Sequence, residues 1–370
     1  MHIFDTFPFD AELDLLEHRL TENYDFVDAF VLVEAAETFS GVPKELTFAR
    51  NRQRFAWADA KLRYVSLNAL GTPQSTARER AAVQRDAVRL ALRDAEPDDI
   101  VLLLDADEIP SHDVLRFLRA HGVDGPSRLL MTRHYEHVDA LAPRSPCCPS
   151  HSVFFQAATP RLRPGEWNHL NGGWQSQSGV AIPFRALNGR NAFDLRFGEV
   201  DAPPLTDAGR HFSSVDPGAR LEEKLGRVFH TEWGGERETR PAHLRRCRLH
   251  GVHHRGWWYA ERPEGPLPDD LRRLADRLND DAAAAPFPAW WRRRLVRTWA
   301  WLRLWRWLPE GTVKAIDRHF ERLLPLAVVP LLAADLMRGF IAAIARAASA
   351  GRHSSSTTTN PRPDISCAKS

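Results

Sequence analysis

The chain has 370 residues, enough for two ordinary domains or for one large domain with an extension. Its hydrophobic content of 43% and charged content of 26% are typical of globular proteins, and a net charge of +2 gives no indication of nucleic acid as a partner. Two of the four cysteines are adjacent and none forms a C-x-x-C pair, so the chain has no disulfide framework and fits a reducing compartment.

The N-terminal segment, MHIFDTFPFDAELDLL, carries acidic residues early and lacks the basic start and long apolar core of a signal peptide. No stretch of the chain reaches the roughly 20 apolar residues that a membrane span needs. We therefore expect a cytoplasmic protein.

Helix and strand signals alternate over the first part of the chain. Short apolar runs predict strands at residues 27–33, 62–67, 100–104 and 129–135. Amphipathic segments predict helices at residues 10–20, from the capping box Thr76–Glu79 onward, and at 113–120. This order predicts an α/β fold with a mostly parallel sheet and helices on both of its faces.

The next segment, residues 143–204, is rich in Pro, Gly, Asn and Trp. Such a composition predicts loops laid over one end of the sheet and no continuous core. Two helices are expected after it, one that begins at Asp216–Pro217 and one over residues 269–278.

Three carboxylates follow directly on the buried strand 100–104, in the sequence DADEIP. Ligands of open α/β sheets bind at the carboxyl ends of the strands, where Asp105 and Asp107 would lie. Two carboxylates on one turn can bind a hard cation such as Mg²⁺ or Mn²⁺, which would leave positions open for phosphate oxygens. The alternative is a solvated turn in which Asp107 or Glu108 caps the following helix.

Four blocks of the chain, which together span about residues 1–280, resemble glycosyltransferase family 17, the β-1,4-N-acetylglucosaminyltransferase-like proteins. The family shows similar segments in the same order, and Arg210 departs from its usual Trp before His. The blocks are ELDLLEHRL with VDAFVLVEAAETFSGVPKELTF, then DADEIP, then AGRHFSSVDPGARLEEKLGRVFHTEW, then HHRGWWYAERPEGPLPDDL.

This resemblance implies a GT-A-like, Rossmann-type fold, a nucleotide-sugar donor and a divalent cation, Mn²⁺ or Mg²⁺. It also implies an inverting transfer of a sugar, by analogy N-acetylglucosamine from UDP-GlcNAc, onto a glycan or lipid-linked acceptor. The residues by themselves indicate the α/β sheet and the carboxylates that suit a metal, and they do not indicate the sugar.

The metal site expected from these motifs contains Asp107 as a direct ligand, with Asp105 either at the metal or at the ribose of the donor. His211 is the expected third ligand, because neutral imidazole can join carboxylates around Mn²⁺, and His230 is the alternative. For both His211 and His230, the other interpretation is a structural role in which the ring binds a backbone carbonyl.

The donor contacts expected beside the metal come from several segments. Glu34 ends the first predicted strand, where the nucleotide base lies in a GT-A fold. The expected diphosphate contacts are Lys44, Arg85 and Lys224, although a solvated charge is the ordinary role of such residues. Inversion needs one general base to deprotonate the acceptor hydroxyl, and Glu232, Asp207 and Asp139 are the candidates.

Two other constellations suggest different functions. His243, Cys247, His250 and His254 fall at spacings of four, three and four, which would suit zinc, although nearby arginines would oppose a cation. The strand-end carboxylates would also suit a metal-dependent nucleotidyl or phosphoryl transferase.

The sequence divides into a catalytic domain over residues 1–285, a helical Trp/Arg-rich extension over 286–350 and a disordered Ser/Thr-rich tail over 351–370. Residues 332–346 of the extension predict an amphipathic helix with an apolar face opposite its arginines. That pattern suits peripheral attachment to the inner face of a membrane, by an enzyme or by a non-catalytic binding protein. The alternative is that the apolar face packs on the catalytic domain.

Overall fold

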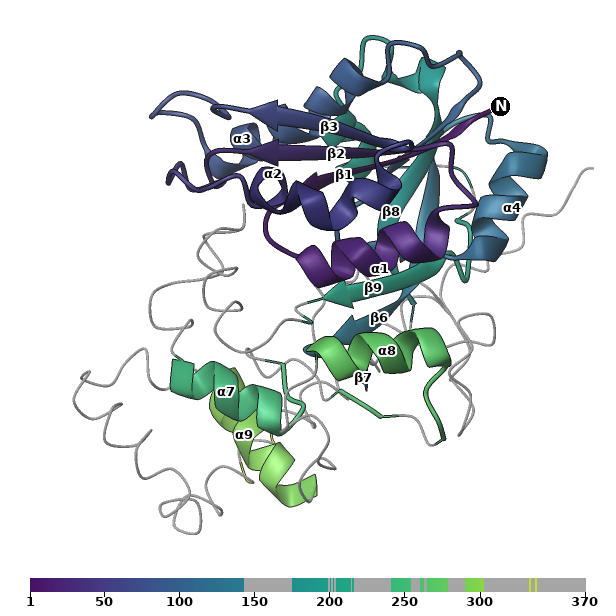
Figure 1. Cartoon of the computed structure of the whole chain (residues 1–370). Coiled ribbons are helices and arrows are strands. Elements are labelled where there is room, and N and C mark those ends of the chain that lie inside the picture. The colour runs from purple at the N-terminus through teal and green to yellow at the C-terminus, as the bar shows by residue number, and fades with distance from the viewer. Residues whose placement is uncertain are drawn as a thin grey trace, which may run out of the picture.

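A computed structural model of the chain describes residues 1–142, 175–198, 204–213, 241–253, 260–262, 265–278 and 290–302, with residues 200, 202, 215, 333 and 337 as single positions. Nine strands of this described part form one sheet in the order β3-β2-β1-β4-β8-β6-β9-β5, with β7 paired to β6 (Figure 1). The α/β fold predicted from the sequence is confirmed.

The parallel half of the sheet has four strands. These are β1 (Ile3–Phe9), β2 (Ala29–Ala35), β3 (Leu62–Leu67) and β4 (Ile100–Leu103). β2, β3 and β4 match the predicted strands to within two residues at each end. The apolar runs of β2 and β4 are buried on both faces of the sheet, whereas β3 is an edge strand with an alternating pattern.

The sequence analysis missed β1, which lies between β2 and β4. Asp5 and Pro8 interrupt its apolar run, and both residue types are rare inside strands. Asp5 is fully buried there because it pairs with the equally buried Arg19 of α1. Pro8 is tolerated because the pairing of β1 with β4 ends at Thr6, so that Pro8 has a neighbouring strand on one side only.

The other half of the sheet is mixed. Its strands are β5 (Glu108–Pro110), β6 (Ser127–Tyr135), β7 (His137–Leu141), β8 (Gln175–Pro183) and β9 (Gly209–Ser213). β8 runs antiparallel to both β4 and β6, whereas β9 runs parallel to β6 and antiparallel to β5.

The prediction of loops alone over residues 143–204 is wrong for its second half. Besides β8, this half forms a 3-10 turn, η4 (Phe184–Leu187), and helix α5 (Ala192–Phe197). Val180 and Ile182 of β8 are fully buried, so this apolar segment, although short and bounded by Gly and Pro, supplies a central strand.

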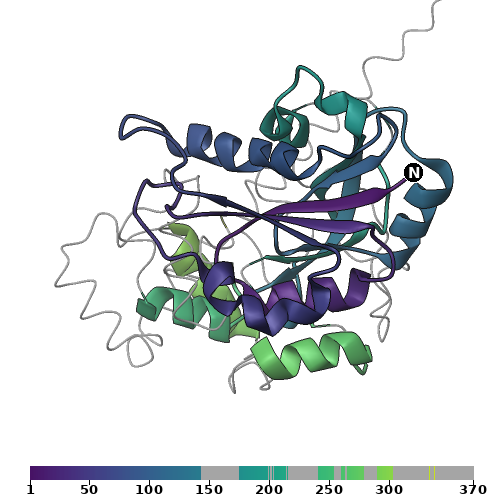
Figure 2. The same ribbon diagram turned by 45° about the horizontal axis from the view of Figure 1, so that its top comes forward.

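Helices cover both faces of the sheet (Figure 2). One face carries α1 (Leu13–Asn23), α2 (Thr47–Asn51), η1 (Arg52–Ala58) and α4 (His112–His121). The core beneath these helices includes Leu16, Leu20 and Phe55. The other face carries α3 (Ala77–Asp86), η2 (Ala87–Ala91), η4 and α5, packed on a core that includes Val88 and Leu195. α3 begins with the predicted Thr76–Glu79 capping box, and α4 ends at Gly122, whose φ is 65°.

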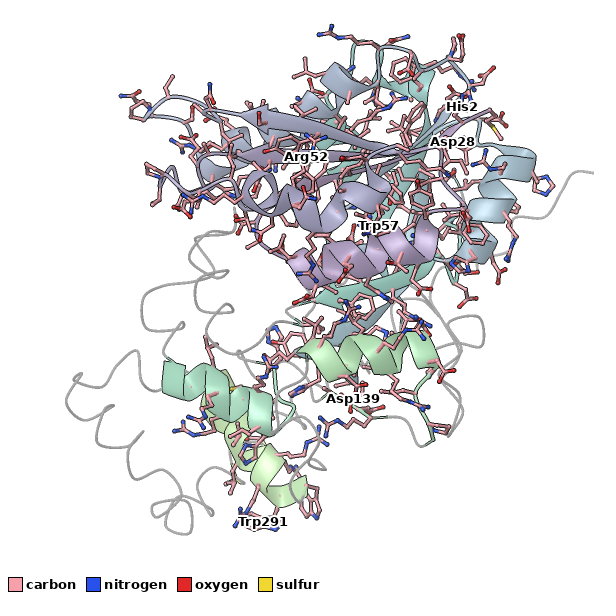
Figure 3. All side chains as sticks on the ribbon, viewed as in Figure 1. His2, Asp28, Arg52, Trp57, Asp139 and Trp291 are labelled. Carbon is pink, nitrogen blue, oxygen red and sulfur yellow. The ribbon has the colours of Figure 1, made fainter. Side chains whose placement is uncertain are left out.

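Three further helices follow the sheet. α8 (Asp269–Leu278) coincides with the predicted helix and packs against β7 and α1, whereas α7 (Pro241–Leu249) packs against α9 (Trp290–Leu302). Arg293 of α9 donates from Nε to the carbonyl of His250 (2.9 Å), and Leu295 and Val296 are buried. The start of the Trp/Arg-rich extension therefore packs on the rest of the protein, while Trp290 and Trp291 stay exposed at the end of α9 (Figure 3).

No helix in the described ranges is long and apolar enough to cross a membrane. The predicted helix that begins at Pro217, and all of the predicted amphipathic helix 332–346 except positions 333 and 337, lie outside the described residues. The membrane-surface expectation and the domain boundaries therefore stay predictions.

We expect the Asp5–Arg19 pair to be essential for stability, because removal of one partner leaves a charge buried without its counterion. Asp5→Asn should lower the free energy of unfolding by about 3–5 kcal/mol, measured by urea denaturation. Asp14→Asn is the matched control, since it breaks a partly exposed pair with Arg54 and should cost no more than about 1 kcal/mol. Equal losses in the two variants would contradict this account.

Candidate functional site

The acidic turn DADEIP leaves the sheet at the carboxyl end of β4 and returns as β5. Two hydrogen bonds close it: the Glu108 amide donates to the Asp105 carbonyl (3.0 Å), and the Asp105 amide donates to Glu108 Oε2 (2.8 Å). β5 then pairs with β9, with Glu108 opposite His211. The predicted carboxylates and the predicted histidine are thus brought together from segments about 100 residues apart.

Arg19 of α1 holds this turn from inside the protein. Its Nη1 donates to the carbonyl oxygens of Asp105 (2.8 Å), Ala106 (3.3 Å) and Glu108 (2.8 Å). Its Nε donates to Asp5 Oδ2 at 2.8 Å, and Nη2 donates to Asp5 Oδ1. The guanidinium therefore neutralises one buried carboxylate and fixes the backbone that presents three others.

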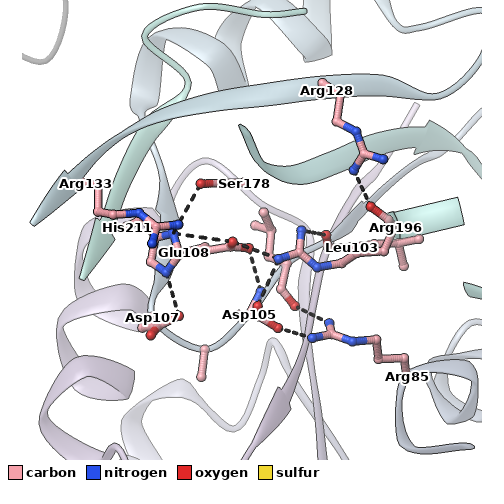
Figure 4. A network of polar contacts seen from close by, with 12 residues as sticks. Arg85, Leu103, Asp105, Asp107, Glu108, Arg128, Arg133, Ser178, Arg196 and His211 are labelled. Atoms are coloured by element: carbon pink, nitrogen blue, oxygen red, sulfur yellow. Dashed lines mark hydrogen bonds and ion pairs between the residues drawn. The ribbon is translucent and has the colours of Figure 1, made fainter. Parts of the chain in front are cut away.

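Asp105 lies between two guanidinium groups (Figure 4). Arg85 of α3 donates to its Oδ1, and Arg196 of α5 donates to its Oδ2 at 2.9 Å. Burial alone would raise the pKa of the Asp105 carboxyl, but Arg196 and Arg85 outweigh that effect and hold the pKa well below its usual range. Asp105 is therefore an ionised carboxylate whose two oxygens are both engaged by arginines.

Glu108 links this arginine side of the site to the histidine side. Its Oε1 accepts a hydrogen bond from Arg196 (2.7 Å) and lies 3.7 Å from His211 Nδ1. Burial raises the pKa of Glu108, and Arg196 opposes that shift.

His211 lies beside Asp107 on the other side of the turn. Its Nε2 is 3.6 Å from Asp107 Oδ1, while its Nδ1 is 3.3 Å from both Ser178 Oγ and Arg133 Nη2. Burial lowers the pKa of His211 to about 3, and the nearby charge of Arg133 adds to this shift. The ring is therefore neutral at physiological pH, which is the protonation state that a metal ligand needs.

The fit to a divalent cation rests on Asp107 and His211. A carboxylate and a neutral imidazole are suitable ligands for Mn²⁺, and phosphate oxygens and water would complete its coordination. Across the described residues, no group of three or more His, Cys, Asp and Glu side chains is arranged to hold a metal. Asp105 is already bound by two arginines, so the described residues would supply two ligands.

The chain matches known proteins over its N-terminal part. Residues 1–137, which hold the acidic turn and Arg19, match the family model described as Glycosyltransferase family 17. Over these residues the chain is similar to that family. The match ends before His211, which lies in the part of the sheet that follows it.

Two similar curated relatives are the β-1,4-mannosyl-glycoprotein 4-β-N-acetylglucosaminyltransferases of Homo sapiens and Rattus norvegicus. Each is 35% identical over 118 residues, which are 30% of this chain and 22% of the relative. The chain thus aligns with about a fifth of the length of these relatives.

Two similar solved structures are those of glucosyl-3-phosphoglycerate synthase from M. tuberculosis. One has a TM-score of 0.31 and 16% identity over 60% of this chain and 75% of that chain. The other, in complex with Mn²⁺, uridine diphosphate and phosphoglyceric acid, has a TM-score of 0.26 and 14% identity over 50% of this chain and 56% of that chain. Scores this low carry no argument about function.

Glu34, the residue expected at the nucleotide base, is fully buried at the end of β2. Its carboxylate accepts hydrogen bonds from the amides of Phe48 (3.0 Å) and Ala49 (3.4 Å) at the start of α2, and from the Tyr64 hydroxyl (2.9 Å). Glu34 therefore fixes a helix N-terminus to the sheet, and these contacts give no support to a role in donor binding.

Lys44 and Arg85, the two predicted diphosphate contacts that the structure describes, bind different carboxylates. Lys44 Nζ lies 3.1 Å from Asp10 Oδ1 and 3.8 Å from Glu34 Oε1, on the Glu34 side. Arg85 reaches the acidic turn, where it binds Asp105. Lys224, Glu232 and His230 lie outside the described residues, so their roles stay predictions.

Two candidate bases lie apart from the acidic turn. Asp207 precedes β9, and its carbonyl accepts a hydrogen bond from the Ser111 hydroxyl at the start of α4 (2.9 Å). That position is the amino end of β9, whereas the turn lies at the carboxyl end of β4. Asp139 of β7 pairs with Arg262 (2.9 Å) beside α8 (Figure 3).

The histidine and cysteine constellation does not form a zinc site in the described residues. Cys247 Sγ lies 3.7 Å from His243 Nε2, but His250 Nδ1 points to the Arg246 carbonyl (2.9 Å). Burial raises the pKa of the Cys247 thiol well above its usual value, which disfavours the thiolate that zinc binds. His254 is outside the described residues.

The sequence analysis missed Arg19, Arg133, Ser178 and Arg196. Arg19 was visible in the motif ELDLLEHRL as a charged residue amid the leucines of a predicted helix, which is the one signal that pointed to it. Arg133 and Ser178 lie on β6 and β8, and the pairing of these strands in the sheet brings them to the acidic turn. Arg196 lies on α5, which packs on the sheet beside β8.

A further buried carboxyl lies at the hairpin between β6 and β7. Glu136 has a φ of 59°, which is uncommon for a residue other than glycine, and its amide donates to the Ser213 carbonyl (3.2 Å). Burial raises the pKa of Glu136 to about 8, although the charge of Arg248 opposes the shift. At neutral pH this side chain is therefore largely protonated.

We expect Glu136→Gln to stabilise the protein increasingly as the pH rises. The folded state keeps the Glu136 proton up to about pH 8, whereas the unfolded chain releases it near the ordinary pKa of 4.5. Wild-type stability should therefore fall between these pH values relative to the variant, by a difference on the order of 4 kcal/mol above pH 8.

Thermal or urea unfolding at pH 5, 7 and 9 measures this difference. Glu45→Gln, at an exposed position, is the matched control and should show no such trend. A constant difference between Glu136→Gln and wild type across that pH range would mean that Glu136 is ionised in the folded protein.

Proposed function

We propose that the protein is a metal-dependent inverting glycosyltransferase that moves a sugar, N-acetylglucosamine from UDP-GlcNAc, onto a glycan or lipid-linked glycan. The proposal is supported by the family match over residues 1–137 and by the names of the similar relatives. The single observation that carries it is the pair Asp107 and His211, whose Oδ1 and Nε2 atoms lie 3.6 Å apart. Asp107 belongs to the acidic turn that the family match includes, and His211 comes from β9, beyond the match.

The residues of the turn have separate roles in this proposal. Asp107 and His211 would hold Mn²⁺ or Mg²⁺, which as a Lewis acid stabilises the charge that develops on the leaving diphosphate. Asp105 keeps Arg85 and Arg196 at the site, and Arg19 fixes the backbone on which both aspartates lie. Fixed charges of this kind need no rearrangement when the reaction occurs.

Inversion at the sugar carbon requires one protein group to accept the proton of the attacking hydroxyl. Glu232, Asp207 and Asp139 are the predicted bases. Because Asp139 is bound to Arg262 and Asp207 lies at the amino end of β9, we propose Glu232 as this base, in an enzyme of the cytoplasm.

The proposal predicts that UDP is released from UDP-GlcNAc in the presence of Mn²⁺, and that EDTA abolishes the release. A panel with UDP-GlcNAc, UDP-GalNAc, UDP-glucose and GDP-mannose identifies the donor. Release of a nucleoside monophosphate in place of UDP would instead indicate a nucleotidyl or phosphoryl transferase.

Asp107→Asn should keep the fold and lower turnover roughly 10²- to 10³-fold, because it removes a charge that would hold the cation without a large change of shape. Asp113→Asn, on the exposed side of the neighbouring helix α4, is the control and should retain full activity. Circular dichroism and UDP release measure the two effects. Normal turnover in Asp107→Asn would refute the metal assignment.

A further inference from the structure

Two adjacent tryptophans are exposed in the first turn of α9. Trp290 is 66% exposed and Trp291 is 38% exposed, whereas Leu295 and Val296 in the next turn are buried. The first turn therefore projects from a helix whose following turn is packed into the protein. Figure 3 shows Trp291 at the end of α9 that points away from the sheet. Adjacent exposed aromatic side chains form an apolar patch of the kind that marks an interaction site.

The helices that carry this patch are strongly basic. α7 contains three arginines and α9 contains four, and neither helix contains an aspartate or a glutamate. Residues 290–308 hold six arginines, six tryptophans and no acidic residue, in a chain whose net charge is only +2. Positive charge is therefore concentrated in the segments that carry the exposed tryptophans, which favours a partner with an anionic surface.

Arg293 fixes the start of α9 to the end of α7. Its Nε donates to the His250 carbonyl (2.9 Å), and its Nη2 donates to the Gly251 carbonyl (3.4 Å). Leu249, the last residue of α7, is exposed beside this junction. The apolar patch is thus carried by two helices that are held to each other.

Two other arginines lie against the tryptophan rings. The guanidinium carbon of Arg292 lies 5.2 Å from the ring centre of Trp291, and that of Arg294 lies 5.6 Å from the ring centre of Trp290. Arg292 is itself exposed. Such pairs suit the boundary between the acyl chains and the headgroups of a bilayer, because the ring can enter the apolar layer while the guanidinium reaches a phosphate.

We propose that the start of α9, together with the end of α7, is a docking surface for the headgroup region of a bilayer that contains anionic phospholipids. Trp290 and Trp291 would enter the interface, and Arg292 would pair with headgroup phosphates. This attachment is peripheral and differs from the predicted attachment through residues 332–346, because other residues contact the lipid. The inference goes beyond the proposed function and does not depend on it.

Co-sedimentation of the full chain with vesicles tests the proposal, using phosphatidylcholine alone and phosphatidylcholine mixed with phosphatidylglycerol. The wild-type protein should bind the anionic vesicles more tightly than the neutral ones, and salt should weaken this binding. The double substitution Trp290→Ala and Trp291→Ala should weaken it roughly 10- to 100-fold, because the apolar contact with the interface is lost. Arg292→Gln should weaken binding to anionic vesicles about 5-fold, the effect of one charge near an anionic surface.

Matched substitutions at other exposed positions are the controls. Trp57→Ala removes an exposed tryptophan from η1, and Arg93→Gln removes an exposed charge, so both variants should bind like the wild type. Met337→Gln, at an exposed position of the predicted amphipathic segment, should also bind like the wild type. Circular dichroism checks that each variant folds. If the double variant does not fold, each single tryptophan substitution should show a smaller loss of vesicle binding.

A wild-type protein that does not sediment with anionic vesicles at low salt would overturn the inference, as would undiminished binding by the folded tryptophan variants. Loss of binding in Met337→Gln alone would place the attachment in residues 332–346 and would also overturn it. Binding to heparin or to a DNA fragment, without binding to vesicles, would identify a polyanion as the partner instead. Vesicle binding by a protein that releases no UDP from any donor would overturn the proposed function and leave this inference intact.

Discussion

The guanidinium of Arg19 is the point on which the candidate site depends. It is fully buried, and it joins the carboxylate of β1 to three carbonyls of the acidic turn. A buried charge is tolerated only where opposite charge and hydrogen bonds compensate it, so Asp5, Arg19 and the turn require one another. The same contacts that stabilise the fold therefore set the position of Asp107.

The turn concentrates negative charge, and the protein balances it in two ways. On one side, Arg85 and Arg196 neutralise Asp105 and Glu108 with direct hydrogen bonds. On the other side, Asp107 lies beside the neutral imidazole of His211, and the positive charge of the buried Arg133 acts on it. A cation at Asp105 would have to displace two arginines, whereas the proposed cation site at Asp107 lies outside those two contacts.

The sequence predicted the elements that follow from local pattern, and it missed those that depend on distant partners. β3, α8 and the Thr76 capping box are set by alternation, amphipathicity and local hydrogen bonds, and the structure confirms them. β1 carries an aspartate that only Arg19 makes tolerable in a core strand, so its own pattern argues against a strand. Arg133 and Arg196 come from β6 and α5, and nothing in their local sequence indicates that they meet Arg85 of α3 at the site.

The position of the site follows from the junction between the two halves of the sheet. β4 is the last strand of the parallel half, and β8 pairs antiparallel beside it. The acidic turn leaves β4 and crosses over to pair, as β5, with β9. β5 and β9 lie so close together here that a Cβ on Gly209 would be 2.1 Å from the Ile109 carbonyl oxygen. The φ of Gly209 is +146°. Only glycine allows β9 to lie there and to place His211 against Asp107. Neither half of the sheet contains the site alone, because Asp107 comes from the turn after the parallel half and His211 from the mixed half.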